Sequence, residues 1–187
     1  MENDECIRAE IDYKKEQKRK ADQKAWNKRK KEGLEELKTK PEHLNDLQII
    51  INAIAREIDK RSTCMMCRCV MKKSNGCHYH SVGSKPSLRF NLLNIWIGCE
   101  SCNNYKGGNI NGYDEVLIDS YGKDKWEVIK FDLPRNNARL SLSIPEIQEL
   151  KPKCRAILKD LKAGPQLTLS ERWDKRLELN NKLGMYE

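Results

Sequence analysis

The chain has 187 residues, of which 34% are charged and only 6% are aromatic, and its formal net charge is +8. A chain of this length does not hold several large domains. Its positive charge favours nucleic acid as a partner, although the charge could also serve only to keep the protein soluble. It contains no apolar run of signal or membrane length, so we expect a cytoplasmic protein without a membrane partner.

The N-terminal residues 5–38 are rich in Lys, Glu, Gln and Ala, which predicts a helix. Residues 14–31 carry ten Lys or Arg against Glu16 and Asp22, so this stretch alone nets +8. Residues 1–40 therefore form a predicted basic helical arm, which either follows DNA phosphates or is a solvated helix. Trp26 either stacks on a base or packs on the protein.

A second predicted helix begins at Pro41, whose ring suits a first helical turn. Its apolar residues recur every three or four positions, as expected for a helix that packs one face: Leu44, Leu47, Ile51, Ile54 and Ile58. We assign residues 41–132 to this helix plus a central core, and residues 133–187 to a C-terminal helical region.

Later elements are predicted from local signals. Residues 111–122 favour a small helix, residues 124–131 fit either a strand or a helix, and residues 134–137 suggest a loop. Ser143 and Glu146 form a predicted capping box, which starts a helix that ends at Gly164. Thr168 and Glu171 open a last helix that runs to about Leu183.

Two Cys-x-x-Cys pairs lie at Cys64, Cys67, Cys99 and Cys102. In a reducing compartment such pairs indicate a metal site, and four thiolates complete the tetrahedral shell of a structural Zn²⁺. A simple zinc ribbon separates its pairs by about 15–20 residues. Here residues 68–98 intervene, which leaves room for further chemistry.

That insert holds His78 and His80, which would project to the same face of a strand. Hydrolysis of a phosphodiester needs a base to deprotonate water and a cation to stabilise the developing charge. A neutral histidine is suited to the first task, and Asn94 is placed to orient it. The Asn103 amide oxygen, with phosphate and water, suits Mg²⁺ or Mn²⁺. A closed four-cysteine Zn²⁺ site has no position left for this role.

A family resemblance is carried by residues that occur in order within residues 60–112: His78-Tyr79, Ser81-Val82-Gly83, Leu88-Arg89-Phe90-Asn91, Asn94-Ile95, Cys99, Cys102-Asn103 and Gly108-Asn109. This run resembles the phage NinG (Rap) recombination endonucleases. The order of Cys-x-x-Cys, His, Asn and Cys-x-x-Cys-Asn is also similar to the HNH, or His-Me finger, nucleases, including the endonuclease VII resolvase of T-even phage.

The resemblance implies an α+β fold with a zinc-stapled ββα-metal centre flanked by long helices. It implies that His78 is the general base on the first strand, that Asn94 orients it, and that Asn103 at a helix start binds the divalent ion. The implied function is a Mg²⁺-dependent endonuclease acting on branched recombination intermediates, such as Holliday junctions or D-loops. We expect Arg89 and Lys106 to contact DNA phosphates, and we expect a homodimer because resolving a junction takes two active centres.

The chain departs from the family pattern at two positions. Many HNH sites have Asp before the base, where this chain has Cys77, and a thiol is a poor Mg²⁺ ligand. Trp96 stands where NinG relatives tend to have His. We expect His80 to replace that histidine as a ligand or a phosphate contact.

Other interpretations of these residues stay open. His78 and His80 suit a second zinc together with Cys69 and Cys77. Asparagines often satisfy loop backbone groups or cap helices, as Asn94 and Asn103 would then do. The alternative functions are a non-catalytic zinc-finger DNA-binding regulator and a sequence-specific HNH nuclease of the homing or restriction type.

Overall fold

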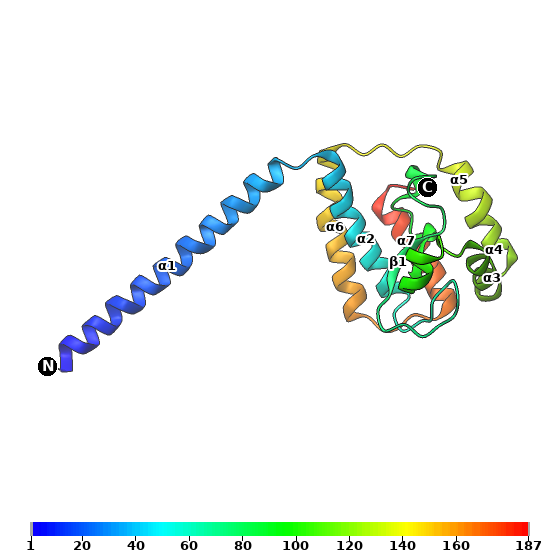
Figure 1. Ribbon diagram of the computed structural model, residues 1–187. Coiled ribbons are helices and arrows are strands. Elements are labelled where there is room, and N and C mark those ends of the chain that lie inside the picture. Colours follow the sequence, from blue (N-terminus) through cyan, green and yellow to red (C-terminus); the bar gives the residue numbers. More distant parts are fainter. Residues whose placement is uncertain (1, 187) are drawn as a thin grey trace. The chain divides into compact units, whose positions relative to one another are not determined.

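The computed structural model describes residues 2–186, with side chains from residue 7 onward (Figure 1). The chain divides into two units, residues 1–39 and residues 40–187. The sequence analysis placed its first boundary near residue 40. Within residues 2–186, no helix is both long and apolar enough to cross a membrane.

The first unit is built on one long helix, α1 (Glu2–Glu36). Its apolar side chains are scattered and exposed, as for Ile7 and Trp26, so the helix has no apolar face to bury. Ion pairs one turn apart support it, including Lys14 with Glu10 at 2.6 Å. The predicted N-terminal helix is confirmed, with bounds shifted by two or three residues.

The second unit begins with α2 (Lys40–Ile58), which has Pro41 in its first turn. Of the predicted apolar stripe, Leu47, Ile51 and Ile54 are fully buried. This face packs against α6 (Ile144–Ala163), and the two helices lie side by side in Figure 1. The amphipathic helix predicted from spacing is therefore confirmed.

A small antiparallel sheet follows, made of β1 (Asn75–His78) and β2 (Ile95–Gly98). The segment between the strands contains two short 3₁₀ turns, η1 (Pro86–Leu88) and η2 (Leu92–Asn94). A two-stranded sheet is marginal alone, but every residue of β2 is buried and α2 packs on both strands. The described residues thus have the predicted α+β character, with helices in the majority.

After the sheet the chain is helical and its elements are short. They are the π-helical turn η3 (Ser101–Tyr105), α3 (Ile110–Tyr121), α4 (Lys123–Glu127), the π-helical turn η4 (Val128–Asp132) and α5 (Leu133–Asn136). The predicted helix at 111–122 is confirmed, and the undecided residues 124–131 are helical. The loop predicted at 134–137 is wrong, because Pro134 occupies the first turn of α5 and Leu133 is buried.

Both predicted capping boxes are present. In the first, the Glu146 carboxylate accepts the Ser143 backbone N–H at 2.7 Å, and α6 follows. In the second, Glu171 bonds the Thr168 N–H in the same way, and α7 (Leu169–Leu183) follows. These boxes satisfy backbone donors that would otherwise have no partner at the helix starts.

Helix α7 joins the helical core to the sheet through a buried ion pair. Arg176 and Asp59 lie 2.7 Å apart and are both almost fully buried. The Arg176 guanidinium also lies 3.8 Å from the centre of the Trp96 ring on β2, and its Nε donates to the Leu92 carbonyl at 3.0 Å. A second boundary was predicted near residue 132, whereas the structure keeps residues 40–187 in one unit.

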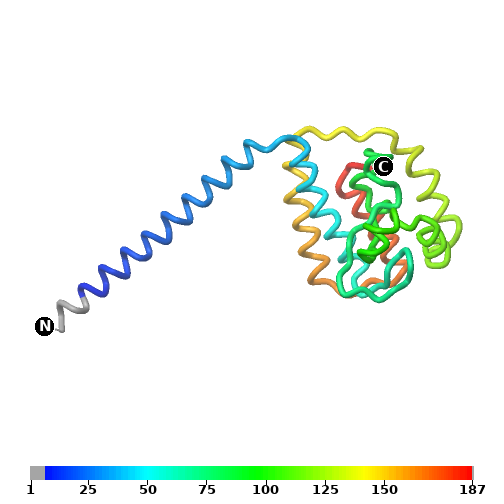
Figure 2. The backbone as a smooth tube through the Cα atoms, viewed as in Figure 1, coloured from blue at the N-terminus to red at the C-terminus, as the bar shows by residue number. Residues whose placement is uncertain are grey.

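The C-terminal residues also hold the segment between the strands. The Tyr186 hydroxyl donates to the Ser87 carbonyl at 2.8 Å, and the Asn180 side-chain oxygen accepts the Leu92 N–H at 3.0 Å. Asn180 also donates to the side chain of Asn91 at 3.0 Å. In Figure 2 the red C-terminal end accordingly lies next to the green segment. Residues 86–94 are therefore fixed from the far end of the chain.

Candidate metal centre and catalytic cleft

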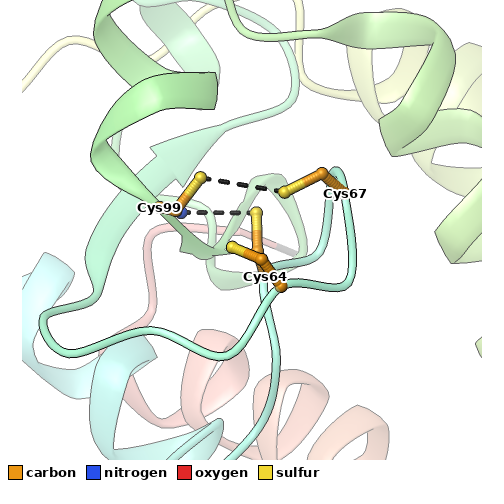
Figure 3. A group of neighbouring side chains, drawn as sticks. Cys64, Cys67 and Cys99 are labelled. Atoms are coloured by element: carbon orange, nitrogen blue, oxygen red, sulfur yellow. Dashed lines mark hydrogen bonds between the residues drawn. The ribbon is translucent and has the colours of Figure 1, made fainter.

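Four thiols gather between the end of α2 and the end of β2. The sulfur atoms of Cys64, Cys67, Cys69 and Cys99 all lie within 4.8 Å of one another. Figure 3 shows three of these side chains directed toward one another, and the Cys67 and Cys99 sulfurs are 3.8 Å apart. Four thiols at this spacing match the donor set of a structural Zn²⁺ site, so the cluster can hold a metal such as zinc.

The membership of this group differs from the predicted set at one position. Cys69 joins Cys64, Cys67 and Cys99, because Arg68 adopts φ +60° and turns the chain back so that the Cys64 N–H meets the Cys69 carbonyl at 3.0 Å. Cys102, the predicted fourth ligand, is buried beside the cluster; its backbone N–H donates to the Cys99 sulfur at 3.4 Å, and its own sulfur accepts from the Asn109 amide at 3.7 Å. Cys102 is thus a fifth thiol next to the four-thiol cluster, whereas a Zn²⁺ ion takes four ligands.

The surroundings of two cluster cysteines favour the thiolate, which is the form that binds metal. Burial opposes ionisation of Cys67, but hydrogen bonds from Cys69 and the neighbouring thiols lower its pKa to about 6. For Cys99, burial is likewise outweighed by the Cys102 backbone N–H and nearby thiols, and the pKa is lowered.

A cleft of about 720 Å³ lies next to the sheet. Its lining includes His78 at the end of β1, His80, and Asn103 from the turn η3. Three of the predicted site residues, separated by up to 25 positions in the sequence, therefore share one cavity. No Asp or Glu is among the residues that line it in the described part of the chain.

Both cleft histidines are held by backbone carbonyls. The Nε2 of His78 lies 2.9 Å from the Arg89 carbonyl, and the Nε2 of His80 lies 2.9 Å from the Ile129 carbonyl. A carbonyl only accepts, so each Nε2 carries the hydrogen and each neutral ring keeps its lone pair on Nδ1. This is the tautomer control that a general base needs.

The charge state of the histidines is also set by their surroundings. Burial lowers the pKa of His78, and the Arg89 charge acts in the same direction while the Arg89 carbonyl opposes it. Burial lowers the pKa of His80 as well, with the Ile129 carbonyl opposing and Lys85 contributing. Both rings are therefore neutral at neutral pH.

The Asn94 side chain hydrogen-bonds backbone groups and not the His78 ring that it was predicted to orient. Its side-chain oxygen accepts the His80 N–H at 2.8 Å, and its amide donates to the carbonyls of His80 and Leu88. The Arg89 carbonyl takes the place beside His78 that the sequence suggested for Asn94. The reason is that Asn94 is fully buried among backbone groups that need partners.

The two predicted DNA-phosphate contacts, Arg89 and Lys106, lie outside the lining of the cleft. Arg89 bonds two residues of α2, with its Nη2 2.6 Å from Asn45 and its Nε 3.1 Å from Gln48. Lys106 is exposed at the end of η3, and Asn103 lies inside that turn rather than at a helix start. Neither Arg89 nor Lys106 is among the cleft residues.

The residues of the alternative second zinc site are not brought together. Cys69 belongs to the thiol cluster, while the buried Cys77 thiol lies 3.6 Å from the Asn75 carbonyl. Both histidines bond backbone carbonyls instead of thiols.

Sequence reasoning missed several cleft residues, among them Lys130 and Phe131. These two lie in the segment whose periodicity fitted both strand and helix, so no pattern marked them. Lys130 lies 2.8 Å from Asp114, a carboxylate that also accepts the hydroxyl of Tyr79.

Known proteins resemble this chain over most of its length. A family model described as Bacteriophage Lambda NinG protein matches residues 2–164. The chain belongs to the NinG family. Protein ninG of Escherichia phage lambda is 31% identical over 127 residues, and protein ninG of Salmonella phage P22 is 29% identical over the same length. Each alignment covers 67% of this chain and about 60% of the relative.

The NinG match extends from α1 through α6, so the thiol cluster and the cleft both lie inside it. Protein ninG of Escherichia phage 933W is similar too, at 30% identity over 127 residues. No solved structure matches this NinG-family chain.

Proposed function

We propose that this NinG-family chain is a divalent-metal-dependent endonuclease of the HNH type that cuts branched DNA. The observation that carries the proposal is the cleft in which His78, His80 and Asn103 meet, with both imidazoles held through Nε2. Phosphodiester hydrolysis needs a fixed, neutral base beside oxygen ligands for a cation.

His78 is the proposed general base. Its Nδ1 takes a proton from a water positioned in line with the scissile bond, and Nε2–H donates to the Arg89 carbonyl throughout. Imidazole suits this task because its pKa lies close to neutrality. The carbonyl fixes the ring so that little reorganisation is needed when the proton moves.

Asn103 and His80 are the proposed ligands for Mg²⁺ or Mn²⁺. The Asn103 amide oxygen is a hard donor that suits either ion, and the His80 Nδ1 suits Mn²⁺ better than Mg²⁺. A site with so few protein ligands fits a weakly held ion completed by phosphate oxygens and water. When bound, the ion supplies charge stabilisation at the phosphoryl group.

The thiol cluster is the proposed scaffold of the site. A Zn²⁺ held by the cluster thiolates would tether the end of α2 to the turn after β2, which contains Asn103. The two strands and the helical segment after them then correspond to the ββα-metal unit. In this proposal zinc has no catalytic role, because a closed shell offers no site for water.

Branched DNA is the proposed substrate, and a homodimer is the proposed form that cuts both sides of a junction. The net charge of +8 supports a polyanionic substrate. Lys106 remains a proposed phosphate contact. Arg89 fits a positioning role as well, since its carbonyl holds His78 and its side chain is tied to α2.

A labelled synthetic four-way junction tests the proposal. The wild-type chain is expected to cut it only with Mg²⁺ or Mn²⁺ present, and His78→Ala is expected to abolish cutting. His78→Gln is the more specific test. The glutamine amide can still donate a hydrogen bond to the Arg89 carbonyl, but an amide cannot act as a general base. We expect this variant to keep the wild-type melting temperature and to lose at least 100-fold in rate, the usual contribution of a general base.

The same cleavage assay distinguishes the proposed function from the alternative functions. Unchanged cutting by His78→Gln would reject His78 as the base. Binding without cutting by the wild type would favour a DNA-binding regulator, and cutting of linear duplex at one sequence would favour a homing or restriction-type nuclease.

A further inference from the structure

One wall of the cleft comes from η4, the π-helical turn between α4 and α5. Ile129 of this turn is fully buried and anchors it, while the next two residues, Lys130 and Phe131, line the cleft. Phe131 is 48% exposed, whereas the other phenylalanine of the chain, Phe90, is 1% exposed. Phe131 thus offers an accessible aromatic surface beside the polar groups that line the cleft.

The Phe131 ring is held in place from one side. Trp126 meets it edge to face, with ring centroids 5.9 Å apart and planes at 77°. Trp126 is itself fixed, because its Nε1 donates to Asp114 at 2.8 Å. Phe131 is therefore a supported platform and not a loose surface side chain.

Lys130 is similarly fixed. Its Nζ lies 2.8 Å from the Asp114 carboxylate and 4.6 Å from the centre of the Trp126 ring. Asp114 shares its charge among three donors, since Tyr79 and Trp126 also bond it. An ammonium group has three hydrogens, so Lys130 can bond Asp114 and still donate to an anion in the cleft.

The same cavity is also lined by an aliphatic side chain and by two glycines. Ile110 is 45% exposed there. Gly107 and Gly108 also line it at φ +56° and +86°, and an added Cβ at either would meet nothing within 4 Å. The cleft thus combines an aromatic ring, an aliphatic side chain, bare backbone and a fixed cation, at a volume typical of small-molecule sites.

We propose that Phe131 and Lys130 form a subsite for one unpaired nucleotide of DNA, with the base stacked on Phe131 and the adjacent phosphate bound by Lys130. This inference rests on the proposed nuclease function and specifies what the cleft recognises. Bases within a continuous duplex stack on each other and cannot reach the ring, whereas an unpaired base at a branch can. The subsite therefore selects branched or gapped DNA over intact duplex without reading sequence.

The test measures binding without cleavage. The full-length chain is titrated, with no Mg²⁺ or Mn²⁺ added, onto a three-way junction that carries fluorescent 2-aminopurine at an unpaired position, and onto a duplex of the same sequence. Stacking on Phe131 is expected to change the 2-aminopurine fluorescence on the junction alone. Phe131→Ala is expected to abolish this signal and to weaken junction binding on the order of 10-fold, with duplex binding unchanged.

Three further variants make the result specific. Phe131→Trp is expected to restore the signal, because it keeps an aromatic surface. Lys130→Met is expected to weaken junction binding and to reduce its salt dependence by about one phosphate contact. Ile49→Ala is the matched control, since Ile49 is an exposed apolar residue on α2 that does not line the cleft.

The outcomes separate this inference from the nuclease proposal. Wild-type fluorescence and affinity in Phe131→Ala, or an equal loss on junction and duplex, would overturn the subsite. If His78→Gln still cuts DNA while Phe131→Ala loses the fluorescence signal, the assigned base fails and the subsite stands.

Discussion

At the residue scale, the two histidines of the cleft are both held by backbone carbonyls. His78 and His80 each give Nε2 to a carbonyl, so neither ring depends on a second side chain for its tautomer. The sequence could not predict this arrangement, because the carbonyls of Arg89 and Ile129 come from segments 11 and 49 residues away. From residue types alone, the side chain of Asn94 was the expected hydrogen-bond acceptor for the His78 ring. In the structure the acceptor is the backbone carbonyl of Arg89.

The lowered pKa of His78 predicts a pH dependence of cleavage. Burial, followed by the Arg89 charge, disfavours the protonated ring, so its pKa lies below the ordinary value of 6.5. A lowered pKa means that the neutral base persists to more acidic pH. The acid midpoint of the single-turnover cleavage rate should therefore lie below pH 6.5. A midpoint at or above 6.5, in a protein whose melting temperature is constant over that range, would contradict this assignment.

The fifth thiol gives a second prediction at this scale. Cys69 and Cys102 both lie at the cluster of Cys64, Cys67 and Cys99, and zinc takes four ligands. We expect Cys69→Ser and Cys102→Ser each to keep one zinc per chain, because the remaining cysteine completes the shell. The double variant should keep none, as measured by zinc release to a colorimetric chelator. Loss of zinc from one single variant alone would show that its cysteine is an obligatory ligand.

At the element scale, α7 and the residues after it act as a clamp on the segment between the strands. Asn180 and Tyr186 bond residues 87–92, and Arg176 bonds Leu92 and Asp59. That same segment supplies the Arg89 carbonyl to His78 and Asn94 to the His80 backbone. The geometry of the cleft therefore depends on a helix that does not itself line it.

Two adjacent asparagines on α7 test the clamp. Asn180 is buried and its loss leaves the Leu92 N–H without its partner, so Asn180→Ala should lower the free energy of unfolding by about 1–3 kcal/mol. Asn181 is exposed, and Asn181→Ala should change it by less than about 0.5 kcal/mol. Urea denaturation of both variants measures the difference. Equal effects would show that Asn180 does not hold the segment.

The elements that sequence predicted well are those with local causes. The capping boxes at Ser143 and Thr168 need only residues three positions apart, and the apolar stripe of α2 needs only helical spacing. The two short helices and the π-helical turn at 123–136 depend on packing against the rest of the unit, as the buried Ile129 and Leu133 show. Local pattern therefore left part of this stretch undecided and misassigned the rest.

At the scale of the whole molecule, the candidate site is assembled from three distant parts of the second unit. Three of the residues singled out from the sequence, His78, His80 and Asn103, line one cleft. The sequence could not locate Lys130 and Phe131, which reach the cleft only because α3 and α4 return the chain to the sheet. Cys69 was missed as a cluster member for a similar reason, since its position depends on the left-handed turn at Arg68.

The dependence of the cleft on α7 has a consequence for synthesis. A ribosome translating this chain releases both histidines and all five cluster cysteines well before Arg176, Asn180 and Tyr186 are made. Until those residues emerge, the segment that positions the histidines lacks its anchors, and Asp59 lacks the arginine that neutralises it. A chain from which α7 has not yet emerged therefore lacks the contacts that hold the segment between the strands, and with them the carbonyl that fixes His78.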